Sequence, residues 1–193
     1  MAFGFDVTYW RCVETFKIMR NSIIRNVTII ITAFVLIIFF LSLTREPVYN
    51  TESLTGNKIT KFQIESLNND ELISYKEISK KKYALINFWA SWCAPCRLEH
   101  EKLIELSKSR DLTIFGVNFK DKKNNAIKYL DEMGNPYTYL LKDPYGKQSV
   151  KFGIYGIPES ILVDRNLIIK KKVIGPLTDV DIKEISDLIM DNK

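Results

Sequence analysis

The chain has few cysteines and a single histidine, and these shortages exclude several classes of protein. Three cysteines in 193 residues are too few for a disulfide-stapled scaffold. A structural zinc site needs about four ligands, whereas two closely spaced cysteines and one histidine are all that the chain offers. Eight glycines and six prolines are too few for a low-complexity or disordered chain. The sequence therefore predicts a globular protein with a packed core.

The net charge of +5 is spread thinly along the chain. Lysines form short runs at residues 80–82 and 170–172. A nucleic-acid-binding face would interleave basic residues with aromatic ones, and neither run does so. The lysine runs are typical of solvated surface, so we expect no nucleic-acid partner.

Residues 26–44 form an uncharged apolar segment, NVTIIITAFVLIIFFLSLT. As a helix it would span about 28 Å, close to the hydrocarbon thickness of a bilayer. A buried core helix would show a polar stripe, which this segment lacks. No small-x-small cleavage site follows it, so a removed signal peptide does not fit. The pattern predicts one uncleaved transmembrane anchor over residues 26–44, followed by a polar linker over residues 45–58.

The charges beside the apolar segment predict its orientation. Four cations precede it and only Arg45 lies close behind it, so residues 1–25 should form a short cytoplasmic N-terminus. In a bacterium this would place a single-pass protein in the inner membrane with its domain on the periplasmic side. Met19 would also make a natural start, in which case Cys12 would be absent. The preceding cations are Arg11, Lys17, Arg20 and Arg25.

Residues 59–193 alternate between strand and helix patterns. Tyr83–Trp89 and Leu112–Asn118 are continuous apolar runs, which are typical of strands buried on both faces. Apolar residues at helical spacing, among them Leu98 in the first segment and Val180 in the last, predict helices over residues 94–109, 122–133 and 179–190. The order predicts an α/β domain, a central mixed sheet flanked by helices. Short strands at residues 61–67 and 138–141, a helical piece in 143–152 and a hairpin from 160–164 and 167–174 complete it.

Cys93 and Cys96 form a C-x-x-C pair where a buried strand meets its helix. Unpaired N–H groups and the positive end of the helix dipole favour an anion there, which lowers the pKa of Cys93. Cys93 is predicted to be the nucleophile. Cys96, more covered, would resolve the mixed disulfide, and the Cys93–Cys96 disulfide would serve with no added cofactor. A static disulfide across this spacing would add little stability.

Two stretches resemble the thioredoxin fold over roughly residues 60–190. Residues 88–96, FWASWCAPC, are similar to its active-site segment, in which Trp92, Ala94 and Pro95 flank the cysteines. Residues 156–158, GIP, are similar to its cis-proline loop. The resemblance implies a thioredoxin-like fold and a cis bond between Ile157 and Pro158, facing the cysteines.

More narrowly, the chain resembles the CcmG/DsbE group of cytochrome c biogenesis thioredoxins. The resemblance implies a reductase outside the cytoplasm that acts on apocytochrome c, or on a cytochrome maturation partner, before haem is attached. It also implies a membrane electron donor of the DsbD/CcdA type, and a partner groove bordered by Asn135, Pro136 and Tyr137. The matching stretches are residues 92–100, 118–121, 134–137 and 155–159.

Asn87 stands where ordinary thioredoxins hold a buried aspartate, and an amide cannot exchange protons. Acidic groups come instead from Glu99, three residues after Cys96, and Glu159, just after the proline. A carboxyl group in a partly apolar site has a raised pKa and can move a proton. We hypothesise that Glu99 or Glu159 assists deprotonation of Cys96. The alternatives are that Glu99 is helix surface and that Glu159 shapes substrate binding.

Three further alternatives stay open at the level of sequence. The protein could be a general periplasmic reductase, or an oxidant of the DsbA kind. A copper-binding module could use Cys93, Cys96 and His100, although His100 fits better as a solvent-facing helix residue. An oxidising compartment would trap the cysteine pair as a disulfide unless electrons arrive across the membrane, so a reductase there requires a membrane donor.

Overall fold

The computed structural model describes the backbone of residues 7–43 and 55–190, and the side chains of residues 21–42 and 55–190. The chain divides into two compact units, Met1–Val48 and Tyr49–Lys193. Residues 1–6, the last residue of the predicted anchor and most of the predicted linker over 45–58 lie outside the described residues.

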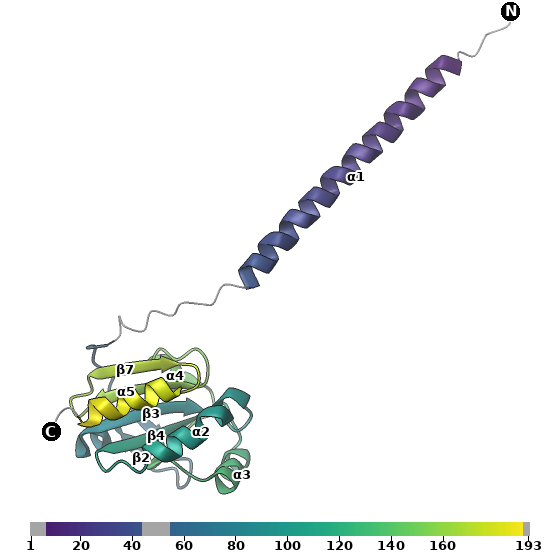
Figure 1. Cartoon of the computed structure of the whole chain (residues 1–193). Helices are drawn as coiled ribbons and strands as arrows, with labels where there is room; N and C mark the ends of the chain where they lie inside the picture. The colour runs from purple at the N-terminus through teal and green to yellow at the C-terminus, as the bar shows by residue number, and fades with distance from the viewer. Residues whose placement is uncertain (1–6, 44–54, 191–193) are drawn as a thin grey trace, which may run out of the picture. The chain divides into compact units, whose positions relative to one another are not determined.

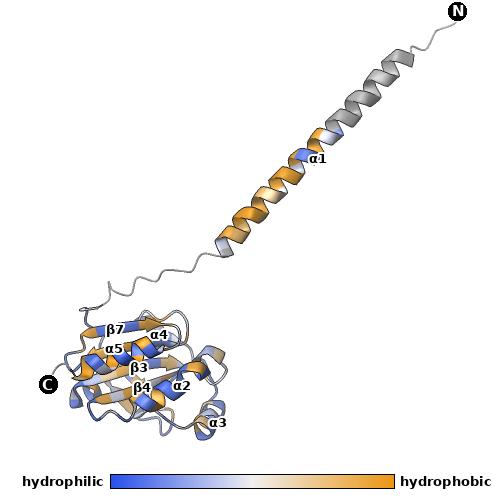
Figure 2. Cartoon of the chain, in the orientation of Figure 1, coloured by the Kyte–Doolittle hydropathy of each residue, from blue (hydrophilic) through white to orange (hydrophobic). Residues whose placement is uncertain are grey.

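The first unit contains one helix, α1 (Val7–Leu43). Its segment Asn21–Ser42 has a mean hydropathy of 2.5, none of it is buried, and it is long and apolar enough to cross a membrane (Figure 2). Thr28 and Thr32 donate their hydroxyls to carbonyls one turn earlier, so their polar groups are satisfied within the helix. The prediction of one N-terminal helix of this kind is confirmed, and the helix extends well before residue 26.

The second unit is built on a five-stranded mixed sheet in the order β5-β4-β3-β6-β7 (Figure 1). Central β3 runs parallel to β4 and antiparallel to β6, and β7 completes the predicted hairpin with β6. Every residue of β3 is buried, as its continuous apolar run predicts. The strands are β3 (Tyr83–Trp89), β4 (Leu112–Phe119), β5 (Tyr139–Asp143), β6 (Glu159–Asp164) and β7 (Ile169–Ile174).

Both faces of the sheet are covered. One core packs beneath α2 (Ala94–Leu106), α3 (Lys123–Met133) and α5 (Asp179–Met190). The other packs beneath a small antiparallel pair and two short helices. This arrangement confirms the predicted α/β fold with helices flanking a mixed sheet. The elements on the second face are β1 (Gln63–Glu65), β2 (Leu72–Ser74), η2 (Tyr75–Lys80) and α4 (Lys147–Lys151).

The structure corrects which side of α2 faces the core. Leu98, predicted on the apolar face, is 76% exposed, whereas His100, predicted to face solvent, is 1% exposed. The buried residues are Cys96, Glu99, His100, Leu103 and Leu106, which follow helical spacing along one stripe. Leu98 falls on the opposite side of that stripe. Val180 of α5 is likewise exposed.

Candidate active site

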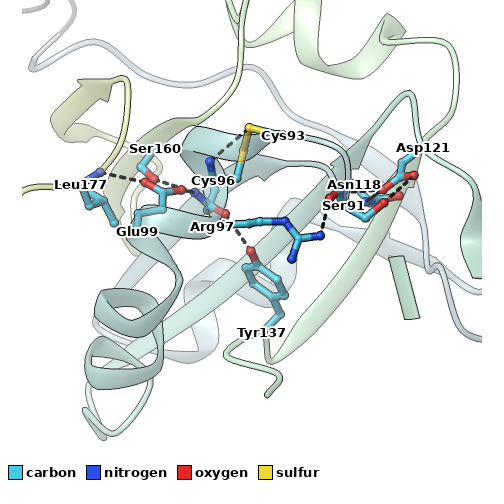
Figure 3. Close-up of a disulfide and its surroundings, with 11 residues drawn as sticks. Ser91, Cys93, Cys96, Arg97, Glu99, Asn118, Asp121, Tyr137, Ser160 and Leu177 are labelled. Carbon is cyan, nitrogen blue, oxygen red and sulfur yellow. Dashed lines mark hydrogen bonds between the residues drawn. A yellow bond between two sulfur atoms is a disulfide. The ribbon is translucent and has the colours of Figure 1, made fainter. Parts of the chain in front are cut away.

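Cys93 and Cys96 are joined by a disulfide at the junction of β3 and α2 (Figure 3). Cys93 is the N-cap of α2, and its sulfur accepts a hydrogen bond from the backbone N–H of Cys96 at 3.2 Å. The same N–H group and the helix dipole would stabilise a Cys93 thiolate in the reduced protein. The sulfur-bearing residues are almost equally buried, at 4% and 3% exposed, so the predicted greater coverage of Cys96 is not seen.

Exposed residues border the disulfide on one side, and the proline loop borders it on another. Trp92, Ala94 and Pro95 are all exposed. The Ile157–Pro158 bond is cis, as the resemblance implies. Pro158 precedes β6, and Phe88 near the end of β3 pairs in register with Glu159, so the proline loop lies level with the cysteine turn.

A buried polar network lies behind the disulfide, centred on Asn87. Its side-chain nitrogen donates to Glu99 Oε1 at 2.8 Å and to Ser160 Oγ at 3.0 Å. Its oxygen accepts from the Tyr137 hydroxyl at 2.9 Å. Glu99 Oε2 accepts from the backbone N–H of Leu177 at 2.8 Å, and Figure 3 shows the carboxyl group turned toward that residue. The amide of Asn87 therefore ties three elements together around one buried acid.

Glu99 is the member of this network that titrates near neutral pH. Burial raises its pKa to about 7, although the hydrogen bonds from Leu177 and Asn87 favour the ionised form. Burial also raises the pKa of Tyr137 well above its ordinary value, so that hydroxyl stays neutral. Glu99 follows Cys96 by three residues on α2, which places both side chains on one face of the helix. Glu99 is not helix surface; it is fully buried.

The Tyr137 side chain is buried, whereas the resemblance implies that this residue borders a partner groove. Its ring stacks on Trp89 with centroids 5.3 Å apart, and it occupies the space above Gly116. A Cβ atom at residue 116 would lie 2.5 Å from the Tyr137 ring, so β4 needs a glycine there. Pro136 is also buried, and only Asn135 is exposed, with its side-chain oxygen accepting from the Tyr137 N–H at 3.0 Å.

Glu159 belongs to the other face of the sheet. Side chains alternate along a strand, and because Ser160 faces Asn87, Glu159 points away from that network. Glu159 Oε1 accepts from the N–H groups of Tyr155 and Gly156, both at 3.3 Å, and Oε2 lies 3.0 Å from the buried Lys172 ammonium. Glu159 therefore fixes the loop before Pro158. Of the two acids, only Glu99 lies on the side of the sheet where it can accept the proton of Cys96.

Asp121 fixes the turn before Cys93, a role that the sequence analysis missed. Its carboxylate accepts from the Ser91 N–H at 2.7 Å, the Ser91 hydroxyl at 3.0 Å, the Asn118 amide at 3.1 Å and the Lys122 N–H at 2.8 Å. In the sequence, residues 118–121 stand out only as a stretch that matches the CcmG/DsbE group. An aspartate just after a buried strand, next to a polar turn, is the signal that could have indicated this anchor.

Two further contacts hold the same turn. The Arg97 guanidinium donates to the Ser91 carbonyl at 3.0 Å and lies over the Tyr129 ring at 4.7 Å. The Trp92 indole N–H donates to the Lys120 carbonyl at 3.2 Å. The residues immediately before the nucleophile are therefore tied both to α2 and to the end of β4.

Replacing Asp121 by Asn should loosen this turn. An amide presents one acceptor and one donor where two carboxylate oxygens now receive N–H and O–H groups, so the unfolding free energy should fall by about 1–3 kcal/mol. Amide hydrogen exchange at Ser91 should accelerate by about tenfold or more. Exposed Asp131 on α3 supplies the matched control, for which Asp131→Asn should change stability by less than about 0.5 kcal/mol. Unchanged exchange at Ser91 in the Asp121 variant would contradict the anchoring role.

His100 is part of the core behind the site. Its Nε2 donates to the Gly134 carbonyl at 3.0 Å, and its ring meets the Tyr129 ring edge-on, with centroids 5.0 Å apart. Burial lowers its pKa, which favours the neutral ring. Within the part of the chain that the structure describes, no three His, Cys, Asp or Glu side chains gather as a metal site. The imidazole is thus engaged in holding the end of α3, which removes the basis for a copper site with Cys93 and Cys96.

Comparison with known proteins assigns the family. The Redoxin family model matches residues 54–189. The chain belongs to the Redoxin family. It is 39% identical over 152 residues to the thiol:disulfide interchange protein HelX of Rhodobacter capsulatus, covering 78% of this chain and 86% of HelX. It is 48% identical over 105 residues to CycY of Rhizobium leguminosarum bv. viciae, covering 54% of this chain and 56% of CycY.

A third relative and a solved structure extend this agreement. DsbE of Escherichia coli K12 is 38% identical over 133 residues, covering 68% of this chain and 71% of DsbE. A DsbF homologue from Corynebacterium diphtheriae has the same fold, with a TM-score of 0.61 at 24% identity over 75% of this chain and 96% of that one. The resemblance to the CcmG/DsbE group and the predicted enzyme class, a thiol:disulfide oxidoreductase, are confirmed.

Proposed function

We propose that this Redoxin family member is a membrane-anchored periplasmic reductase that serves cytochrome c assembly. The observation that carries the proposal is the buried carboxyl group of Glu99, with a pKa of about 7, on the same helix face as Cys96. A thiol pair with an acid of this kind behind it can deliver two electrons to a client disulfide near neutral pH.

The reaction runs in two exchange steps. The Cys93 thiolate attacks one sulfur of the client disulfide, and the other client sulfur leaves as a thiolate. Cys96 then loses its proton to Glu99 and attacks the Cys93 sulfur, which releases the second client sulfur. The client gains two electrons and is reduced, while Cys93 and Cys96 are left as the disulfide. Each turnover therefore requires an outside reductant, for which a membrane donor of the DsbD/CcdA type is the proposed source.

The N-terminal helix supports a membrane location for this chemistry. Its apolar segment Asn21–Ser42 can span a bilayer, and the cations before it favour a cytoplasmic N-terminus. The proposed organisation is a cytoplasmic segment to residue 25, an anchor over 26–44, a linker over 45–58 and the domain over 59–193. A tether would raise the effective concentration of the domain for both donor and client.

The client class rests on the resemblance to the CcmG/DsbE group, which implies apocytochrome c or a maturation partner. The equilibrium potential of the Cys93–Cys96 pair, measured against glutathione and dithiothreitol, tests the direction of electron flow. We expect a value nearer to that of thioredoxin, about −270 mV, than to that of DsbA, about −120 mV. A value near DsbA's would overturn the reductase role and leave an oxidant, and failure to reduce a disulfide-bonded apocytochrome would leave a general reductase.

A further inference from the structure

Four segments of the domain meet at the end of the sheet opposite the active site, which we call the basal end. It consists of residues 56–59, the 75–82 segment before β3, the 107–111 turn before β4 and the 164–168 turn between β6 and β7. Tyr83, the first residue of β3, donates its N–H to the Asp111 carbonyl at 3.1 Å and pairs in register with Asp164. The cysteines follow the other end of β3, which is seven residues and about 20 Å long.

The first described residues of the domain lie at this same end. The Ile59 N–H donates to the Leu167 carbonyl at 2.9 Å, and the Ile169 N–H donates to the Asn57 carbonyl at 2.9 Å. Lys58 pairs with Ile168 as an isolated bridge. The described part of the domain therefore begins within the predicted linker, and its first residues lie beside β7 (Figure 1).

The basal end carries a net positive charge. Its four segments carry eight Lys and Arg against three Asp and Glu, whereas residues 55–190 as a whole carry 22 against 18. The excess of cationic over acidic residues in the four segments is thus larger than the excess in residues 55–190 as a whole. The acids are Glu77, which pairs with Lys80, Asp164, which pairs with Lys170, and Asp111. The cations are Lys58, Lys76, Lys80, Lys81, Lys82, Lys108, Arg110 and Arg165.

These cations lie at the surface and close to one another. All are exposed except Lys82, which is half-buried. Lys81 donates its ammonium to the Arg110 carbonyl at 3.3 Å, which brings the 75–82 and 107–111 segments together. A compact group of cations of this kind is attracted to an anionic surface over about one Debye length, roughly 8–10 Å at physiological salt.

We propose that the basal end binds the anionic headgroups of the bilayer that holds α1. This inference rests on the proposed membrane anchoring. The tether brings these cations next to the lipid surface, and their attraction to it turns the opposite end of β3, with Cys93 and Cys96, away from the bilayer. The active site is thereby presented to partners in the aqueous compartment.

Lysine acetylation of the full chain in nanodiscs tests the proposal. One nanodisc preparation contains phosphatidylglycerol and the other only phosphatidylcholine, and mass spectrometry follows the modification rate of each lysine. Lys81 and Lys108 should react at least about threefold more slowly in the anionic discs, and the difference should vanish near 1 M salt, where the Debye length is about 3 Å. Lys122 and Lys128, near the active-site end, are internal controls whose rates should not differ. Equal rates for Lys81 and Lys108 in both discs would overturn the proposal.

A charge-reversal pair sharpens the test. Lys81→Glu with Lys108→Glu should abolish the lipid-dependent protection of Lys76 and Lys80, whereas Lys122→Glu with Lys128→Glu should leave it intact. Persisting protection in the first pair would also contradict the proposal. If the wild-type chain washes off the discs at high salt, the anchoring itself is wrong and this inference falls with it. If the wild-type chain stays on the discs at high salt but its lysine acetylation rates do not depend on the lipid, only the binding of the basal end to the headgroups is refuted.

Discussion

Glu99→Gln should slow the resolution of the mixed disulfide by about 10²-fold at pH 8, because general-base assistance commonly contributes 10²–10⁴-fold. Glutamine keeps an oxygen that can accept from Asn87 or Leu177 but cannot take the proton of Cys96. In the wild-type protein only ionised Glu99 accepts that proton, so the rate should rise with pH up to its pKa of about 7 and then level off. The variant should lose this inflection. Quench-flow trapping of the mixed disulfide between pH 5.5 and 8.5 measures both effects.

Glu101→Gln is the matched control, since it makes the same charge change on the same helix at an exposed position. It should resolve mixed disulfides at the wild-type rate and keep the inflection near pH 7. If Glu99→Gln also resolved at the wild-type rate throughout this pH range, Glu99 would be a structural acid only. A lower melting temperature without a change in the pH profile would point to the same conclusion.

Replacing either cysteine by serine should block disulfide exchange, but at a different step for each. Cys96→Ser leaves the nucleophile at the helix N-terminus but removes the resolving thiol, so it should accumulate a stable mixed disulfide through Cys93. Cys93→Ser should form none, because a serine hydroxyl is not ionised near neutral pH. Both should lower turnover to less than about one hundredth of the wild-type value. Non-reducing electrophoresis with a disulfide-bonded substrate measures the adduct. A stable adduct in Cys93→Ser would reverse the assigned roles.

Much of the fold could be predicted because its central elements carry strong local patterns. Tyr83–Trp89 is a continuous apolar run bounded by a lysine and by a small-residue turn, and β3 has those bounds. The C-x-x-C pair follows it directly, so its place at the strand–helix junction needed no knowledge of the other strands. The cis bond at Ile157 followed from the resemblance alone.

The polar network could not be predicted in the same way, because it depends on packing between distant segments. Glu99 is buried because α2 turns that side toward β3, and the exposure of Leu98 shows that hydropathy alone misjudged the rotation of this helix. Glu99 and Glu159 looked equivalent in sequence. Only the alternation of Glu159 and Ser160 along β6 separates them onto opposite faces of the sheet.

The close contact between Gly116 and Tyr137 has an evolutionary consequence. Because the Tyr137 ring fills the space that a side chain on β4 would need, the two positions cannot drift independently. An alignment of relatives should therefore show correlated substitution, with a residue larger than glycine at the first position only where the second holds a smaller one. Since the Tyr137 hydroxyl also reaches Asn87, such an exchange would remove one hydrogen bond from the amide behind the disulfide. Lineages that changed this pair would be expected to have replaced Asn87 as well.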